Sequence, residues 1–160
     1  MSRAPRPPRP AVPLRLEVGA ANDTNFAAVM RQTAKHRPFL EYATGVVVPA
    51  VLDQLVHGAN VMGVRDSRLV AYAGWLRAPR AAAEAWIRGG PLPSPDWTAG
   101  DAAIITVFLA DDPGDLPALI RGISHVCAGM PVFRMRVFND SRPEKRRVPI
   151  QGRRQFPVAP

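Results

Sequence analysis

A nearly continuous apolar run at Ala103–Leu109 is the feature that most constrains how this chain can fold. Such a run is typical of a strand that is buried on both faces of a sheet. The chain has 160 residues, of which 47% are hydrophobic and 21% are charged, so it can bury one core around that strand. We therefore expect a single folded domain in which this run is a central strand.

Two helices are predicted ahead of that strand. Asn22 or Asp23 can cap the first, whose apolar residues recur at helical spacing. This helix should end before Pro38, because the residue that precedes a proline is pushed out of the helical region. The second helix is predicted over Glu41–Val56, with Pro49 bending or splitting it.

The segments between the second helix and the apolar run predict a β-hairpin and a short helix. Asn60–Arg65 and Arg68–Leu76 read as paired strands around the turn residues Asp66 and Ser67. Alanine-rich Arg80–Arg88 favours a short helix, and a loop rich in glycine and proline follows it.

The segment after the run predicts one more helix and two strands. Asp112 can cap a helix that carries a single apolar stripe and ends at Gly129. Val132–Phe138 and Arg147–Gln151 are predicted to finish the chain as strands. This order of elements indicates an α/β (α+β) fold with a mixed central sheet flanked by helices.

The two ends of the chain are basic. Residues 1–12 alternate arginine and proline, so we expect a disordered arm there, a folded domain over 13–152 and a basic tail over 153–160. The formal net charge is +8, and basic side chains gather near the end: Arg136, Arg142, Lys145, Arg146, Arg147, Arg153 and Arg154. A solubilising surface and an acidic macromolecular partner explain this patch equally well. Nucleic acid is a weaker interpretation, because no helix-turn-helix, zinc-finger or RNA-binding signature accompanies the charge.

Several functional classes are disfavoured by what the sequence lacks. The longest apolar stretch, Val46–Val56, is interrupted by Pro49 and Asp53 and is too short to span a bilayer. No apolar segment follows the first arginines, so a signal peptide is not expected, and we predict a cytoplasmic protein. The lone Cys127 excludes an intramolecular disulfide, and no metal site is expected.

Several short segments occur in the order seen in one family of enzymes. They are His36-Arg37, Val48-Pro49-Ala50-Val51, the strand Val70–Trp75 that ends in Gly-Trp, the turn Asp96-Trp97-Thr98-Ala99-Gly100-Asp101, and Lys145-Arg146-Arg147-Val148 with Gln151-Gly152. Over about residues 36–152 the chain thus resembles the toxin-activating lysine acyltransferases, the hemolysin-activator family that acts on RTX toxins. These enzymes move a fatty acyl chain from acyl carrier protein to lysine side chains of a protoxin. The family looks like an offshoot of the GNAT acyltransferases, so the resemblance implies a single GNAT-like acyltransferase domain.

The resemblance also implies which residues carry the chemistry. The family's catalytic histidine carries over to His36, a residue type whose unperturbed pKa suits a general base. The family's catalytic aspartate would lie at Thr106 or Val107, but Ala102–Ala110 contains no carboxylate, and Asp111 is expected to come too late along the strand. The Thr106 hydroxyl is then expected to accept a hydrogen bond from the imidazole instead.

The acyl donor is expected where two neighbouring parallel strands separate, as in GNAT folds. The residues that this places at the donor are Gly74, Trp75, Val107 and Phe108, with Arg146 and Arg147 facing the carrier. The expected donor is an acyl thioester on acyl carrier protein or on coenzyme A, with no resident cofactor.

The sequence therefore favours an N-acyltransferase that acylates a lysine or ornithine side chain of a protein or ribosomal peptide. A catalytically inactive relative that serves as an adaptor is the alternative, because the family aspartate is missing. A nucleic-acid-binding module is a weaker third interpretation, and a homodimer is left open.

Overall fold

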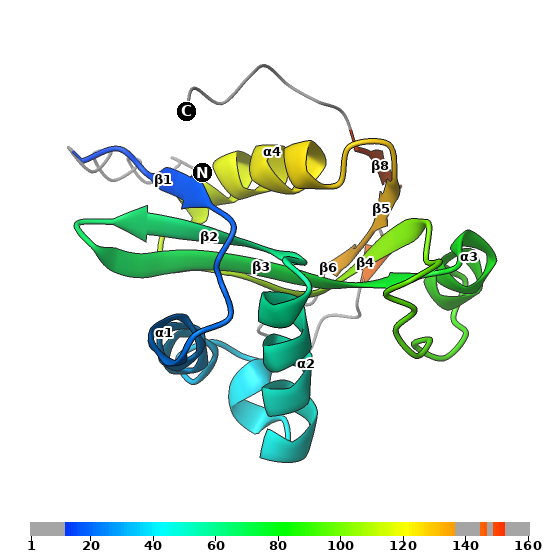
Figure 1. Cartoon of the computed structure of the whole chain (residues 1–160), viewed down its shortest axis with the longest axis horizontal. Coiled ribbons are helices and arrows are strands. Elements are labelled where there is room, and N and C mark those ends of the chain that lie inside the picture. Colours follow the sequence, from blue (N-terminus) through cyan, green and yellow to red (C-terminus); the bar gives the residue numbers. More distant parts are fainter. Residues whose placement is uncertain (1–11, 137–144, 147–148, 153–160) are drawn as a thin grey trace, which may run out of the picture.

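The computed structural model describes residues 12–136, 145–146 and 149–152, which form a mixed α/β fold (Figure 1). The described helices are α1 (Asp23–Thr33), α2 (Thr44–Val56), α3 (Arg80–Ile87) and α4 (Leu116–Val126), with the 3-10 turns η1 (Phe39–Glu41) and η2 (Pro113–Asp115). The strands of the main sheet are β1 (Arg15–Glu17), β2 (Asn60–Arg65), β3 (Arg68–Ala78), β4 (Ala102–Ala110), β5 (Pro131–Phe133) and β8 (Ile150–Gln151). A second, two-stranded sheet pairs β6 (Met135–Arg136) with β7 (Lys145–Arg146).

The predicted helices are confirmed, with small shifts at their ends. Asn22 caps α1, because its side-chain oxygen accepts a hydrogen bond of 2.8 Å from the Asn25 backbone N–H. The second helix begins at Thr44 instead of Glu41, since η1 occupies the segment just before it. It continues through Pro49 as one helix, so of the two predicted effects, bending or splitting, the split does not occur.

The six-stranded sheet runs in the order β1-β2-β3-β4-β5-β8, and only β4 and β5 are parallel. The predicted hairpin joins β2 to β3, and both of its turn residues, Asp66 and Ser67, have positive φ, as a tight two-residue hairpin turn requires. Helix α4 connects β4 to β5 and covers one face of the sheet, while α1 and α2 cover the other (Figure 1). The predicted strand over Val132–Phe138 divides at Arg134 into β5 and β6, and its last residues lie outside the described part of the chain.

Strand β4 is central, as predicted, but it is buried on both faces only in its first half. From Ala102 to Ile105 every residue is buried, whereas Thr106, Phe108 and Ala110 are partly exposed. The change occurs where β5 stops pairing with β4, because the parallel register includes only Ala103 opposite Val132 and Ile104 opposite Phe133. The second half of the strand therefore borders an opening at the edge that β5 leaves unpaired.

None of the helices in the described segments is long and apolar enough to cross a membrane.

An ion pair ties the end of the hairpin to the start of α4, and removing it should destabilise the fold. The Arg65 guanidinium donates two hydrogen bonds, of 3.0 and 2.8 Å, to the Asp115 carboxylate, and only 15% and 9% of the two side chains are exposed. Asp115→Asn should lower the free energy of unfolding by about 1–3 kcal/mol, because the partly buried guanidinium loses its counter-charge.

Chemical denaturation measures this change, and Glu17→Gln is the matched control. Its ion pair with Arg15 is 70% and 41% exposed and should contribute about 0.5 kcal/mol or less. Equal effects of the two substitutions would contradict a stabilising role for the pair of Arg65 and Asp115.

Candidate functional site

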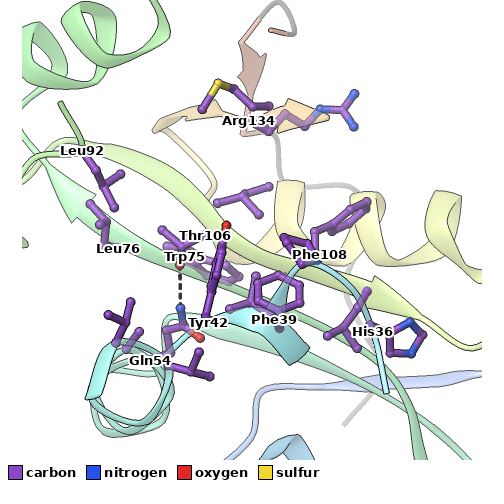
Figure 2. Close-up of a pocket in the computed structure, with 18 of the residues that line it drawn as sticks. His36, Phe39, Tyr42, Gln54, Trp75, Leu76, Leu92, Thr106, Phe108 and Arg134 are labelled. Carbon is purple, nitrogen blue, oxygen red and sulfur yellow. Dashed lines mark hydrogen bonds between the residues drawn. The ribbon is translucent and has the colours of Figure 1, made fainter. Parts of the chain in front are cut away.

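A cavity of about 920 Å³ lies along the second half of β4 (Figure 2). Segment η1 and helix α2 form one wall, and α4 with residues 134–135 forms the other. Most of the side chains that face it are apolar, among them Phe39, Tyr42, Trp75, Leu76, Leu92 and Phe108. Burying apolar ligand surface in such a groove contributes about 25 cal/mol per Å². The groove is therefore suited to an elongated apolar ligand.

The backbone of β4 is open along this groove. Within the described segments, no strand pairs with Ile105–Ala110 on the side where β5 pairs with the first half. Unpaired strand edges offer alternating N–H and C=O groups to an extended ligand. A β-bulge marks the same place: Gly74 lies opposite Val107 and Trp75 opposite Ile105, so Thr106 is the extra residue.

A buried polar network holds the bulge. The Gln54 side-chain Nε2 donates a hydrogen bond of 2.8 Å to the Thr106 hydroxyl, and the Tyr72 hydroxyl donates one of 3.0 Å to the Gln54 oxygen. Gln54 is 2% exposed and Tyr72 is completely buried, and burial raises the pKa of the Tyr72 phenol. The network joins α2 to β3 and β4 beside the groove.

Gly74, which the sequence placed at the acyl donor, lies under the Gln54 amide. A Cβ atom at position 74 would overlap the carboxamide group of Gln54. The glycine therefore makes room for the residue that holds Thr106.

Gly74→Ala should lower the free energy of unfolding by about 1–3 kcal/mol, because it displaces Gln54 and breaks the hydrogen bonds at the bulge. Gly45→Ala is the control, since a Cβ atom at Gly45 in α2 meets no atom within 4 Å. An alanine in a helix should raise stability there by about 0.5–1 kcal/mol. Thermal unfolding of both variants measures these changes in stability. A Gly74→Ala protein as stable as the parent would contradict this account.

A histidine and a carboxylate meet at one end of the groove. The His36 Nε2 atom lies 3.2 Å from the Asp111 Oδ1 atom, with 25% and 41% of the two side chains exposed. The buried Gln32 donates a hydrogen bond of 3.2 Å from Nε2 to the other carboxylate oxygen of Asp111. Asp111 does come after the end of β4, as expected, but it is still within reach of His36, because the segment after α1 brings His36 to the place where that strand ends.

The two residues predicted to act together, His36 and Thr106, are not in contact. Thr106 is bonded to Gln54, and His36 is paired with Asp111. Asp111 follows Thr106 by five residues, which is about 16 Å along a strand at about 3.3 Å per residue. Figure 2 shows His36 and Thr106 well apart, with Phe39 and Tyr42 between them.

The remaining predicted site residues fall into two groups. Trp75, Val107 and Phe108 do line the groove. Arg146 lies in β7, and Arg147 lies outside the described residues.

The predicted Asp96–Asp101 turn is a local structure that closes one end of the groove. The Asp96 carboxylate accepts hydrogen bonds from the backbone N–H groups of Thr98 and Ala99. Trp97 stacks on His57 at the end of α2, with ring centroids 4.3 Å apart and an interplanar angle of 10°. This stack fixes the loop that carries Leu92 against α2.

Cys127 is not suited to act as a nucleophile. It is completely buried, and burial raises the pKa of its thiol to about 12, so the thiol stays protonated near neutral pH. Among the described residues, no group of three His, Cys, Asp or Glu side chains is placed to hold a metal ion.

Gln32 and Gln54 are the residues that sequence reasoning missed, and Asp111 is one that it considered and set aside. Gln32 and His36 are four residues apart, a spacing that could have suggested a shared partner, but nothing local marks Asp111 as that partner. A scan against protein-family models finds no match to the chain, and a search among curated proteins finds none either.

Proposed function

We propose that this chain is an N-acyltransferase that moves a fatty acyl group from a thioester on acyl carrier protein to a lysine or ornithine side chain of a protein or peptide. The observation that carries the proposal is the apolar groove along the unpaired half of β4, which has a histidine–carboxylate pair at one end. The antiparallel strands β1–β4, followed by the parallel β4-α4-β5 crossover, support a GNAT-like fold of the kind that the resemblance implies.

The proposed donor lies with its acyl chain in the groove and its thioester near His36. Each methylene removed from water there contributes about 0.8 kcal/mol to binding. The unpaired β4 backbone offers hydrogen bonds to the donor's polar part. The basic residues near the end of the chain, Arg146 and Arg147 among them, are the proposed contact with an acidic carrier.

His36 is the proposed general base. A lysine amine is largely protonated near neutral pH and must lose a proton to attack. When Nε2 carries the hydrogen that faces Asp111, Nδ1 is the basic nitrogen, and it takes the proton from the amine. The amine nitrogen bonds to the carbonyl carbon, the C–S bond breaks, and the carrier leaves as a thiol after taking up the proton. The Asp111 carboxylate stabilises the imidazolium that forms between these steps.

The test is acyl transfer with defined donors. Acyl carrier protein loaded with acyl chains of graded length is incubated with the chain and a lysine-rich acceptor, and mass spectrometry detects acylated amines. A long-chain donor should be used better than an acetyl donor, because only the long chain fills the groove. If no acceptor is acylated with any donor, and no protein or peptide encoded beside this chain is acylated either, the proposal is wrong.

A further inference from the structure

We infer that Asp111 and Gln32 are positioning residues for His36, so that a carboxylate at the exit of β4 orients this imidazole. The resemblance assigns no role to either residue, because it expects the carboxylate at Thr106 or Val107. The inference rests on the proposed function for its kinetic test and on the geometry of these side chains for its structural test.

Gln32 is the first element of this arrangement. It is a polar side chain in a buried position of α1, and burying an amide without hydrogen bonds is costly. Its Nε2 group donates to the Leu69 backbone carbonyl and to the Asp111 carboxylate. Both partners only accept hydrogen bonds, so the NH₂ side of the amide must face them. The amide therefore links β3 to the residue that follows β4.

Asp111 is held from two directions. Its backbone N–H donates a hydrogen bond of 2.8 Å to the Val70 carbonyl, which continues the β3–β4 pairing past the end of the strand. Its Oδ2 atom accepts from Gln32, and this leaves Oδ1 facing His36 Nε2 at 3.2 Å. The carboxylate is thus oriented before any ligand binds.

His36 needs such a partner because of its own position. It follows the end of α1, and its ring is 25% exposed at the edge of the groove. A partly exposed ring rotates among several rotamers unless a hydrogen bond selects one. The contact with Asp111 selects the ring orientation, and it keeps the hydrogen on Nε2 and the lone pair on Nδ1.

The neighbouring Asp112 provides a matched control. Its carboxylate accepts a hydrogen bond of 2.8 Å from the Gly114 backbone N–H and caps η2. Asparagine caps helices as well as aspartate does, so Asp112→Asn changes the charge next to Asp111 while keeping the local structure.

The kinetic test compares Asp111→Asn, Gln32→Met and Asp112→Asn in the acyl-transfer assay. Asp111→Asn should lower kcat by about 10²-fold or more, and Gln32→Met by about 10-fold, with KM for the donor little changed. Asp112→Asn should behave as the parent does. In a His36→Ala background, Asp111→Asn should cause no further loss, because Asp111 acts through His36. The inference would be overturned if Asp111→Asn kept the parent's kcat. It would also be overturned if Asp111→Asn lowered kcat by the same factor in the His36→Ala background as in the parent.

The structural test does not depend on activity. Long-range ¹H–¹⁵N NMR correlations of the neutral His36 ring identify which nitrogen carries the hydrogen, and they should show Nε2–H in the parent and in Asp112→Asn. Asp111→Ala should shift both ring-nitrogen resonances. A hydrogen on Nδ1 in the parent, or a spectrum that Asp111→Ala leaves unchanged, would overturn the inference. If the protein gave the expected spectrum but transferred no acyl group, the proposed function would be rejected. The pairing of His36 with Asp111 would still stand.

Discussion

Replacing His36 by alanine will lower the rate of acyl transfer by about 10²–10⁴-fold, the usual contribution of a general base. His36 is partly exposed and lies in the segment between α1 and η1, so the substitution should change the free energy of unfolding by about 0.5 kcal/mol or less. Single-turnover rates with acyl carrier protein as the donor, measured together with chemical denaturation, separate the two effects.

Lys35→Ala is the control for His36→Ala. Lys35 is exposed and adjacent in the sequence, and it does not line the groove. The variant should keep the parent's rate. A fully active His36→Ala protein would show that the proton is accepted elsewhere, and the histidine–carboxylate pair would then have no part in the reaction.

Filling the groove will remove the preference for long-chain donors. Ala50 is a small residue on the α2 wall, and Ala50→Trp should occupy space that the acyl chain needs. Displacing about four methylenes at about 0.8 kcal/mol each should lower kcat/KM for a long-chain donor by roughly 200-fold. The rate with an acetyl donor should change little, because an acetyl group does not reach that part of the groove.

Val56→Trp adds the same bulk to the same helix at a residue that is 64% exposed and does not line the groove. It should leave the chain-length preference unchanged. If Ala50→Trp used long and short donors in the parent's ratio, the acyl chain would not lie in this groove. If both variants lost all activity and unfolded early, smaller substitutions at Ala50, such as leucine, would be compared instead, and an unchanged preference there would contradict the assignment equally.

Local patterns in the sequence determined the secondary structure. The cap at Asn22 and the turn at Asp66-Ser67 involve residues within a few positions of each other, so their chemistry is visible in the chain itself. The apolar run at Ala103–Leu109 identified β4 as an inner strand, because a strand with few polar residues has to be covered on both faces. His36 lies at the edge of the groove, and its chemical role stays a prediction.

Only the tertiary structure decided which side chains meet. His36 and Asp111 are 75 residues apart, and Gln54 and Thr106 are 52 residues apart. A pattern along the chain shows which face of an element is apolar, but it does not show how far one element extends past another. The groove beside β4 exists because β5 ends early and leaves the second half of β4 unpaired. His36 meets Asp111 because the chain after α1 passes the end of β4. These contacts depend on the packing of α1, α2 and α4 against the sheet, which no local spacing in the sequence records.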